Sequence, residues 1–98
     1  MTTRAIRAVS AAQRRIAENL NLARRQQRIT VELLAARTGL STPTVSRMIN
    51  KGEGSLENFL RIAAVLQLLD GVTEATNPLN TPIGEALAFE QTPQRVRY

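Results

Sequence analysis

The sequence predicts an all-α fold with a flexible C-terminal tail, and three observations support this. Of the 98 residues 43% are hydrophobic but only 3% are aromatic, so the core must be aliphatic, which suits packed helices better than sheets. Up to about residue 75, apolar residues recur at helical spacing, and each such stretch follows a residue that can cap a helix. Beyond Thr76, prolines interrupt that spacing. A chain of this length builds one small core.

The first two predicted helices follow from their start and stop signals. Residues 1–10 form a basic N-terminal arm for which the pattern favours no particular structure. Ser10 and Gln13 then make a capping box, and the first helix is predicted over about 11–27, with a buried stripe of Ala12, Ile16, Leu20, Ala23 and Gln27. Thr30 caps the second helix. Gly39 ends it, because glycine tolerates the left-handed conformation that follows a helix.

The third predicted helix lies in "GLSTPTVSRMINKG". Ser41 caps it, and Pro43 falls in its first turn, where a missing N–H costs little. Val45, Met48 and Ile49 form an apolar face, and the helix closes near Asn50. Its other face carries hydroxyls and an arginine, which a core helix does not need. We therefore expect that face to contact something polar.

The fourth predicted helix begins after Ser55 and carries two apolar stripes. The first contains Leu56, Phe59, Leu60, Ala63 and Leu66, and the second contains Ile62, Val65 and Leu69. Two stripes predict burial on two sides, against the core and against a second subunit. A short fifth helix is expected over about 68–75, which completes a DNA-binding and dimerisation domain over 11–76. The proline-containing tail, 77–98, is expected to resist helix formation and to extend away, although "IGEALAFE" could form one or two helical turns.

Charge and missing residue types limit the function. The chain carries a net charge of +5, and residues 1–30 hold seven arginines against one glutamate, which favours a polyanionic partner; the alternative is a basic surface that serves only solubility. No cysteine or histidine is present, so disulfides, thiolate nucleophiles and the usual general base are excluded. We expect no enzyme, no cofactor and no metal site. No apolar run has the length of a membrane span, and a cytoplasmic protein is expected.

The second and third predicted helices, joined by a short glycine turn, have the helix-turn-helix arrangement. A major groove admits one α-helix, whose side chains then reach base edges. Thr42, Pro43, Thr44 and Arg47 lie near the leading end of the third helix, and they are the predicted base contacts. Two helices with a glycine turn also occur in any helical hairpin, so the arrangement alone does not decide the function.

The segment "IAENLNLARRQQRITVELLAARTGLSTPTVSRMINKG" resembles the Cro/phage-repressor type of helix-turn-helix family, over about 16–70. The resemblance implies five helices, a homodimer and palindromic double-stranded operators. It also matches Thr42, Pro43, Thr44 and Arg47 to base-reading positions. The phosphate contacts that we expect are Arg24, Arg28, Thr30, Ser41, Asn50 and Lys51, with a structural ion pair as the alternative for Arg24. Two positions depart from the family: Val31 replaces its usual glutamine and Arg28 its frequent glycine.

The C-terminal half is similar to HipB-like antitoxins, the repressors encoded beside HipA-type kinase toxins. The likeness rests on "LQLLD", the proline linker and the closing "PQRVR". It implies a repressor of its own operon that also binds a HipA-like kinase. The apolar and basic side chains of the tail make Phe89, Arg95, Arg97 and Tyr98 the expected contacts with that partner. An auxiliary DNA contact is the alternative for the two arginines. Two other functions remain: a solitary phage or restriction-system regulator, and an adaptor that binds only protein.

Overall fold

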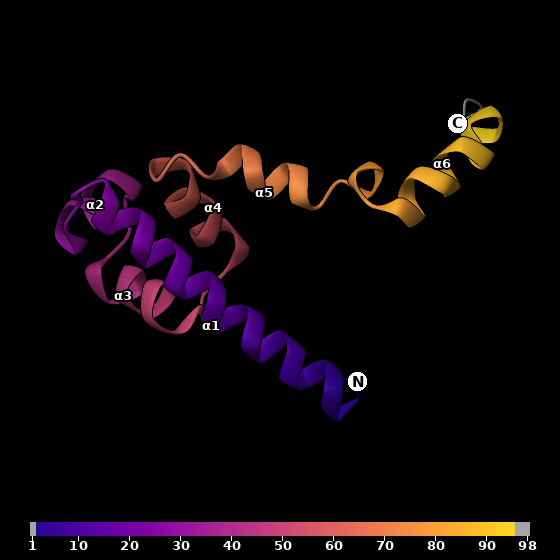
Figure 1. Cartoon of the computed structure of the whole chain (residues 1–98). Helices are drawn as coiled ribbons and strands as arrows, with labels where there is room; N and C mark the ends of the chain where they lie inside the picture. The colour runs from indigo at the N-terminus through magenta and orange to yellow at the C-terminus, as the bar shows by residue number, and fades with distance from the viewer. Residues whose placement is uncertain (1, 96–98) are drawn as a thin grey trace. The chain divides into compact units, whose positions relative to one another are not determined.

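The computed structural model describes residues 2–95, with side chains up to residue 90, and it confirms the all-α fold. The helices are α1 (Thr3–Gln26), α2 (Val31–Thr38), α3 (Thr42–Lys51), α4 (Leu56–Val65), α5 (Leu69–Ala75) and α6 (Pro82–Arg95), with a 3₁₀ turn η1 (Pro78–Asn80) before α6 (Figure 1). They divide into two compact units, Met1–Leu68 and Leu69–Tyr98. Among the described residues, no helix is both long and apolar enough to cross a membrane.

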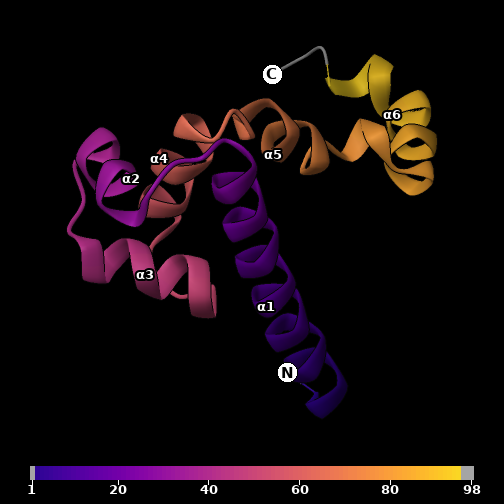
Figure 2. The ribbon, with the colours of Figure 1, turned by 60° about the vertical axis from the view of Figure 1, so that its left-hand side comes forward.

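The core of the first unit is aliphatic, as the composition predicts. Helix α1 packs against α3, and α2 packs against both α3 and α4 (Figure 2). The buried cluster consists of Leu20, Ile29, Leu34, Ala35, Val45, Met48, Ile49, Ile62 and Leu66. Every one of the four helices, and the turn after α1, contributes to it. The cluster therefore holds α2 and α3 in one fixed arrangement.

The predicted caps of α2, α3 and α4 are confirmed. The hydroxyls of Thr30, Ser41 and Ser55 each accept a hydrogen bond from the backbone N–H three residues on, at 3.0 to 3.2 Å. Gly39 ends α2 with φ +76°, in the left-handed region. These local signals fix the lengths of the helices because they satisfy backbone groups that the helix ends leave unpaired.

Helix α1 begins eight residues earlier than predicted, so the start at residue 11 is wrong. Thr2 caps it by accepting from the Ala5 N–H at 3.1 Å, and the basic arm is the first part of the helix. Ser10 and Gln13 lie inside the helix instead of forming a capping box. The buried stripe also differs: Ala17 and Leu20 are buried, whereas Ile16 is 41% exposed, because the core begins only at this level of α1.

Helix α4 buries members of both predicted stripes. Ile62 of the second stripe is fully buried together with Ala63 and Leu66 of the first, whereas Leu56 is 69% exposed. Leu56 therefore does not join the core of this unit, because it lies in the first turn beyond the edge of the core. Val65 is only partly buried, and Leu68 is 37% exposed.

The second unit is helical where the sequence predicts an extended tail. The prolines do not prevent this, because Pro82 occupies the first position of α6, where the missing N–H has no partner to lose. The Thr81 hydroxyl caps α6 by accepting from the Gly84 N–H at 2.9 Å. Gly84 lies directly against the Pro78 carbonyl, so a side chain there would collide with η1. The prediction that these residues resist helix formation is wrong.

Candidate nucleic-acid interface

Helix α3 has one buried face and one open face. Val45, Met48 and Ile49 are buried at 3% exposure or less. Pro43, Arg47 and Asn50, spaced by four and three residues, lie on the opposite side and are exposed. Figure 2 shows α3 at an edge of the first unit, with the other helices of that unit on one side of it. The open face is thus accessible along the length of the helix.

The open face can donate and accept hydrogen bonds at its leading end. Thr42 is exposed and Thr44 is partly buried. The hydroxyls of Ser41 and Thr44 lie 2.8 Å apart, which holds Thr44 beside the cap. Among the described residues, no hydrogen bond or ion pair engages the Arg47 guanidinium, so its fork of donors remains available. The arrangement suits contacts with base edges.

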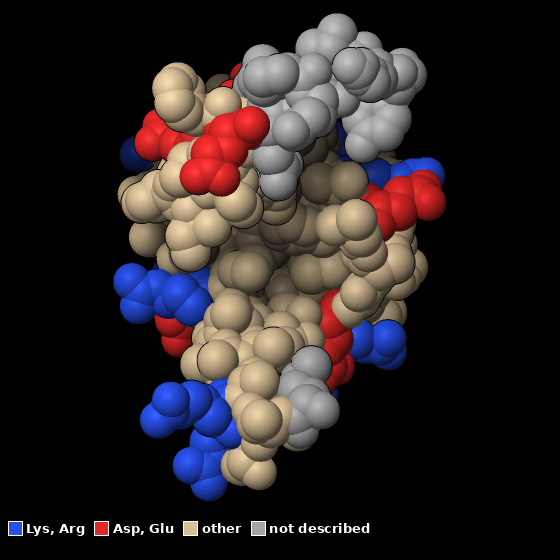
Figure 3. Space-filling model, turned by 90° about the vertical axis from the view of Figure 1, so that its right-hand side faces the viewer, with Lys and Arg blue, Asp and Glu red and all other residues tan. Residues whose placement is uncertain are grey.

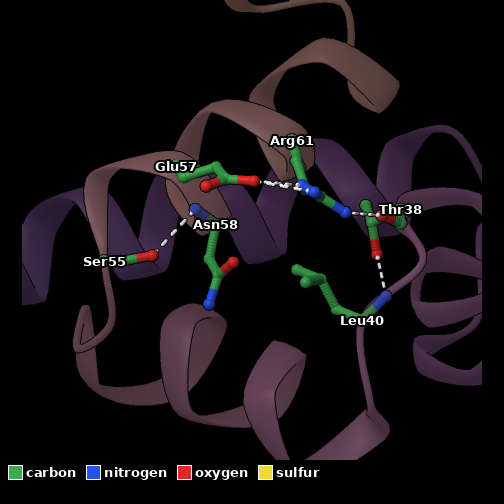
Figure 4. A network of polar contacts seen from close by, with 6 residues as sticks. All are labelled: Thr38, Leu40, Ser55, Glu57, Asn58 and Arg61. Carbon is green, nitrogen blue, oxygen red and sulfur yellow. Dashed lines mark hydrogen bonds and ion pairs between the residues drawn. The ribbon is translucent and has the colours of Figure 1, made fainter.

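An arginine that the sequence analysis did not select holds the turn between α2 and α3 (Figure 4). Arg61 of α4 donates from NH1 to the Thr38 carbonyl at 3.2 Å, and from Nε and NH2 to the Glu57 carboxylate at 3.1 and 2.7 Å. The Thr38 hydroxyl in turn accepts from the Leu40 N–H at 3.4 Å. The spacing of Glu57 and Arg61 could have revealed the ion pair, but only the folded chain brings Thr38 to it.

The other end of α3 lies directly against α1. Gly52 follows α3 with φ +69°, and an added Cβ would collide with the backbone of Gln13. The Gln13 amide donates to the Gly52 carbonyl at 3.3 Å. Glycine is therefore required here for two reasons, its conformation and the space it leaves. Both ends of α3 are positioned by contacts with other helices.

Arg24, expected at a phosphate, is engaged inside the unit. Its Nε and NH2 donate to the Asn21 side-chain oxygen at 3.0 and 2.7 Å, and its NH1 donates to the Ile29 carbonyl at 2.9 Å. The side chain is partly buried and ties the end of α1 to the turn that follows. This geometry favours a structural role for Arg24. The side chain fills that role through hydrogen bonds to neutral groups, not through the ion pair considered above.

The other expected phosphate contacts are all exposed. Thr30 and Ser41 stand at the starts of α2 and α3, while Asn50 and Lys51 form the last turn of α3. Arg28 lies in the turn before α2, with φ +58°. This left-handed conformation explains why glycine suits the position. The structure thus brings Ser41 beside Thr42 and Thr44, and Asn50 and Lys51 one turn beyond Arg47.

The N-terminal part of α1 is basic. Residues 3–17 include Arg4, Arg7, Arg14 and Arg15 and no acidic residue. In Figure 3 this end of the helix is the lowest part of the view, and it shows Lys and Arg atoms without Asp or Glu atoms among them. Four of the seven arginines of the N-terminal third therefore lie on the first part of one helix.

The expected partner-binding residues lie in the second unit or outside the described residues. Phe89 on α6 is 86% exposed. The side chain of Arg95 and the whole of Arg97 and Tyr98 lie outside the described residues. Ile83 and Leu87, 74% and 47% exposed, follow each other four residues apart on α6. Together with Phe89 they give α6 exposed apolar side chains.

Comparison with known proteins identifies the family. The family model described as helix-turn-helix matches residues 15–70, more than half of the chain and all of α2, α3 and α4. No curated protein and no solved structure matches significantly. The match agrees with an α3 that is fixed at both ends and open on one face. The chain belongs to the helix-turn-helix family of the Cro/phage-repressor (XRE-like) type, whose function is that of DNA-binding transcription regulators.

Proposed function

We propose that the protein is a sequence-specific repressor that inserts α3 into the major groove of its operator. One observation carries the proposal: the Arg47 guanidinium is exposed on the open face of α3 and has no partner among the described residues, behind a leading end that carries Thr42, Pro43 and Thr44. Short side chains there let the helix backbone approach the bases. A bidentate arginine one turn later reaches the acceptors of guanine.

The experiment is a titration of Arg47→Ala against the cognate operator, selected from random DNA, and against unrelated DNA. Loss of a base contact costs about 1–3 kcal/mol on the operator and relaxes the preference at one position. The matched control is Lys51→Ala, next to the open face. We expect this variant to bind every DNA more weakly, and the slope of its affinity against salt concentration to fall by about one phosphate contact. Equal loss on both DNAs for Arg47→Ala would assign Arg47 to a phosphate.

The proposed unit on DNA is a homodimer that reads a palindromic operator, with half-sites about 34 Å apart. Support comes from the α4 side of the first unit, where Val65 is only partly buried and Leu68 is 37% exposed. A single unpaired footprint, together with a monomer by light scattering at micromolar concentration, would contradict it.

The proposed second activity is that of an antitoxin that binds a HipA-like kinase and regulates its own operon. Exposed Ile83, Leu87 and Phe89 on α6 support this, because exposed apolar side chains on one helix suit a groove on another protein. Arg95, Arg97 and Tyr98 are the proposed additional contacts. If no partner exists, the protein is a solitary regulator of the same DNA-binding type, and if it binds no DNA it is a protein-only adaptor.

The antitoxin proposal is tested by calorimetry of the chain lacking 91–98 against the operator and against the kinase encoded by the neighbouring gene. We expect operator binding and dimerisation to stay nearly intact and kinase binding to weaken. The control is the full-length Phe89→Ala variant, which removes one apolar contact and leaves the arginines in place. Loss of DNA binding with unchanged kinase binding would make the tail a DNA arm.

A further inference from the structure

The contact between Gln13 and Gly52 fixes α1 beside the turn that follows α3. The Gln13 amide donates to the Gly52 carbonyl at 3.3 Å, and a Cβ added at Gly52 would collide with the Gln13 backbone. Lys51, an expected phosphate contact, is the last residue of α3 and immediately precedes this turn. Helix α1 therefore passes α3 at the end where the proposed function places DNA phosphates.

The N-terminal part of α1 continues past α3, away from α2 and α4. In Figures 1 and 2, α2 and α4 lie above α3, whereas the first turns of α1 lie below it. The core residues of α3 face α2 and α4, so the open face of α3 is turned toward the level of these first turns. From Thr3 to Gln13 the helix is about 15 Å long. This length passes several phosphates, since each DNA strand carries one phosphate per about 3.4 Å of axis.

One side of this part of α1 carries only side chains that can donate hydrogen bonds. They are Thr3, Arg7, Ser10 and Arg14, at spacings of four, three and four residues, which places them in one stripe along the helix. The stripe lies next to Gln13, about 100° around the helix. Among the described residues, no hydrogen bond or ion pair engages the guanidinium of Arg7 or of Arg14, so both remain available to a ligand.

The chemistry and the place of this donor stripe select DNA phosphates as its partner. Guanidiniums and hydroxyls are typical groups for phosphate contacts, and a guanidinium can bind one phosphate through two parallel N–H groups. Arg7 and Arg14 are about 10 Å apart along the helix, so they reach different phosphates of one strand. An acidic protein would also match the charge. Lys51, at the neighbouring turn, instead favours the duplex that α3 enters.

We propose that the donor stripe of Thr3, Arg7, Ser10 and Arg14 binds the DNA backbone next to the phosphate held by Lys51. The inference rests on the proposed insertion of α3 into DNA and adds a second binding surface to it. Phosphate contacts carry no sequence information, so the stripe strengthens binding to every DNA and leaves the base preference of α3 unchanged.

The test compares two double variants of the full chain. Arg7→Gln, Arg14→Gln removes both guanidiniums of the donor stripe. The matched control, Arg4→Gln, Arg15→Gln, removes the same charge from the same part of α1, but on the side opposite Gln13. The plot of log affinity against log salt should become less steep by about 1.8 for the stripe variant, and by less than half of that for the control. The change should be the same on the operator and on unrelated DNA.

Hydroxyl-radical footprinting on the operator locates the contacts. We expect the stripe variant to lose protection at backbone positions that adjoin those exposed by Lys51→Ala, and the control variant to keep them. Equal changes in salt dependence for the two double variants would overturn the proposal, because charge in general and not the stripe would then matter. Loss of protection far from the Lys51 positions would overturn it as well.

Failure of the donor stripe is distinguishable from failure of the proposed function. If the stripe variant binds like the wild type while Arg47→Ala still relaxes the sequence preference, only the stripe is refuted. A wild type that binds no DNA refutes both. Residues 69–90 hold four acidic and no basic residues. Salt-dependent self-association without DNA that the stripe variant loses, with its DNA binding unchanged, would assign the stripe to this acidic segment of another copy and refute the phosphate contact.

Discussion

The guanidinium of Arg61 donates to the backbone carbonyl of Thr38 at 3.2 Å, which joins α4 to the last residue of α2. The carbonyl belongs to the end of a helix, where it has no intrahelical partner. The same guanidinium pairs with Glu57. The contact therefore supports the turn from which α3 departs.

We expect Arg61→Ala to lower the free energy of unfolding by about 1 kcal/mol, because a helix-end carbonyl loses its donor and a solvent-exposed ion pair disappears. Glu57→Gln is the control, since it removes the ion pair alone and should cost no more than about 0.5 kcal/mol. Urea unfolding followed by circular dichroism measures both. Equal losses would mean that the bond to Thr38 contributes nothing.

Gly52→Ala should destabilise the first unit by more than about 1 kcal/mol, because the added Cβ collides with the backbone of Gln13 and the residue has φ +69°. Gly71→Ala is the matched control: nothing lies within 4 Å of its Cβ position, and it stands inside α5. Alanine is about 1 kcal/mol better than glycine within a helix. The midpoint temperature of thermal unfolding should therefore fall for Gly52→Ala and rise for Gly71→Ala.

Arg28 tests the backbone of the turn before α2. Its φ of +58° predicts that Arg28→Gly is more stable than Arg28→Ala by about 1 kcal/mol, although both remove the same charge. Chemical unfolding of the pair isolates the backbone effect. If Arg28 also holds a phosphate, both variants lose DNA affinity equally. Greater stability of the alanine variant would contradict the left-handed conformation.

Arg24→Ala should reduce stability by about 1–3 kcal/mol, since the partly buried guanidinium donates to both Asn21 and Ile29. A phosphate contact alone predicts a different result, namely unchanged unfolding and a lower salt dependence of DNA binding. Measuring both quantities on one preparation separates the two roles. Arg25→Ala is the control, because this neighbouring side chain is exposed and makes no hydrogen bond or ion pair with the described residues.

Leu34→Ala should lower the free energy of unfolding by about 2–5 kcal/mol, because this side chain of α2 is completely buried and its removal leaves a cavity. Leu33→Ala is the control, at the adjacent position and 38% exposed. We expect a much smaller change in its denaturation midpoint. Similar losses for both would show that the burial of α2 differs from the packing described above.

The sequence by itself determined the start of α2, α3 and α4, the end of α2 and the buried face of α3. These features depend on groups a few residues apart: Thr30, Ser41 and Ser55 cap their own helices, and Val45, Met48 and Ile49 share a face through helical spacing alone. The residues expected on the open face of α3 followed from the same spacing. The family resemblance added roles for them that no local signal contains.

Tertiary structure decided what the side chains of α1 and α4 meet, whereas the start of α1 depends on a local cap. The capping pattern at Ser10 was a plausible start, but Thr2 provides another, and local signals cannot rank two competing caps. Only folding brings Arg61 to Thr38 and Gln13 to Gly52, since the carbonyls that accept these hydrogen bonds carry no side-chain signature. Contacts between distant segments depend on how the helices pack, and packing is a property of the whole unit and not of any short stretch.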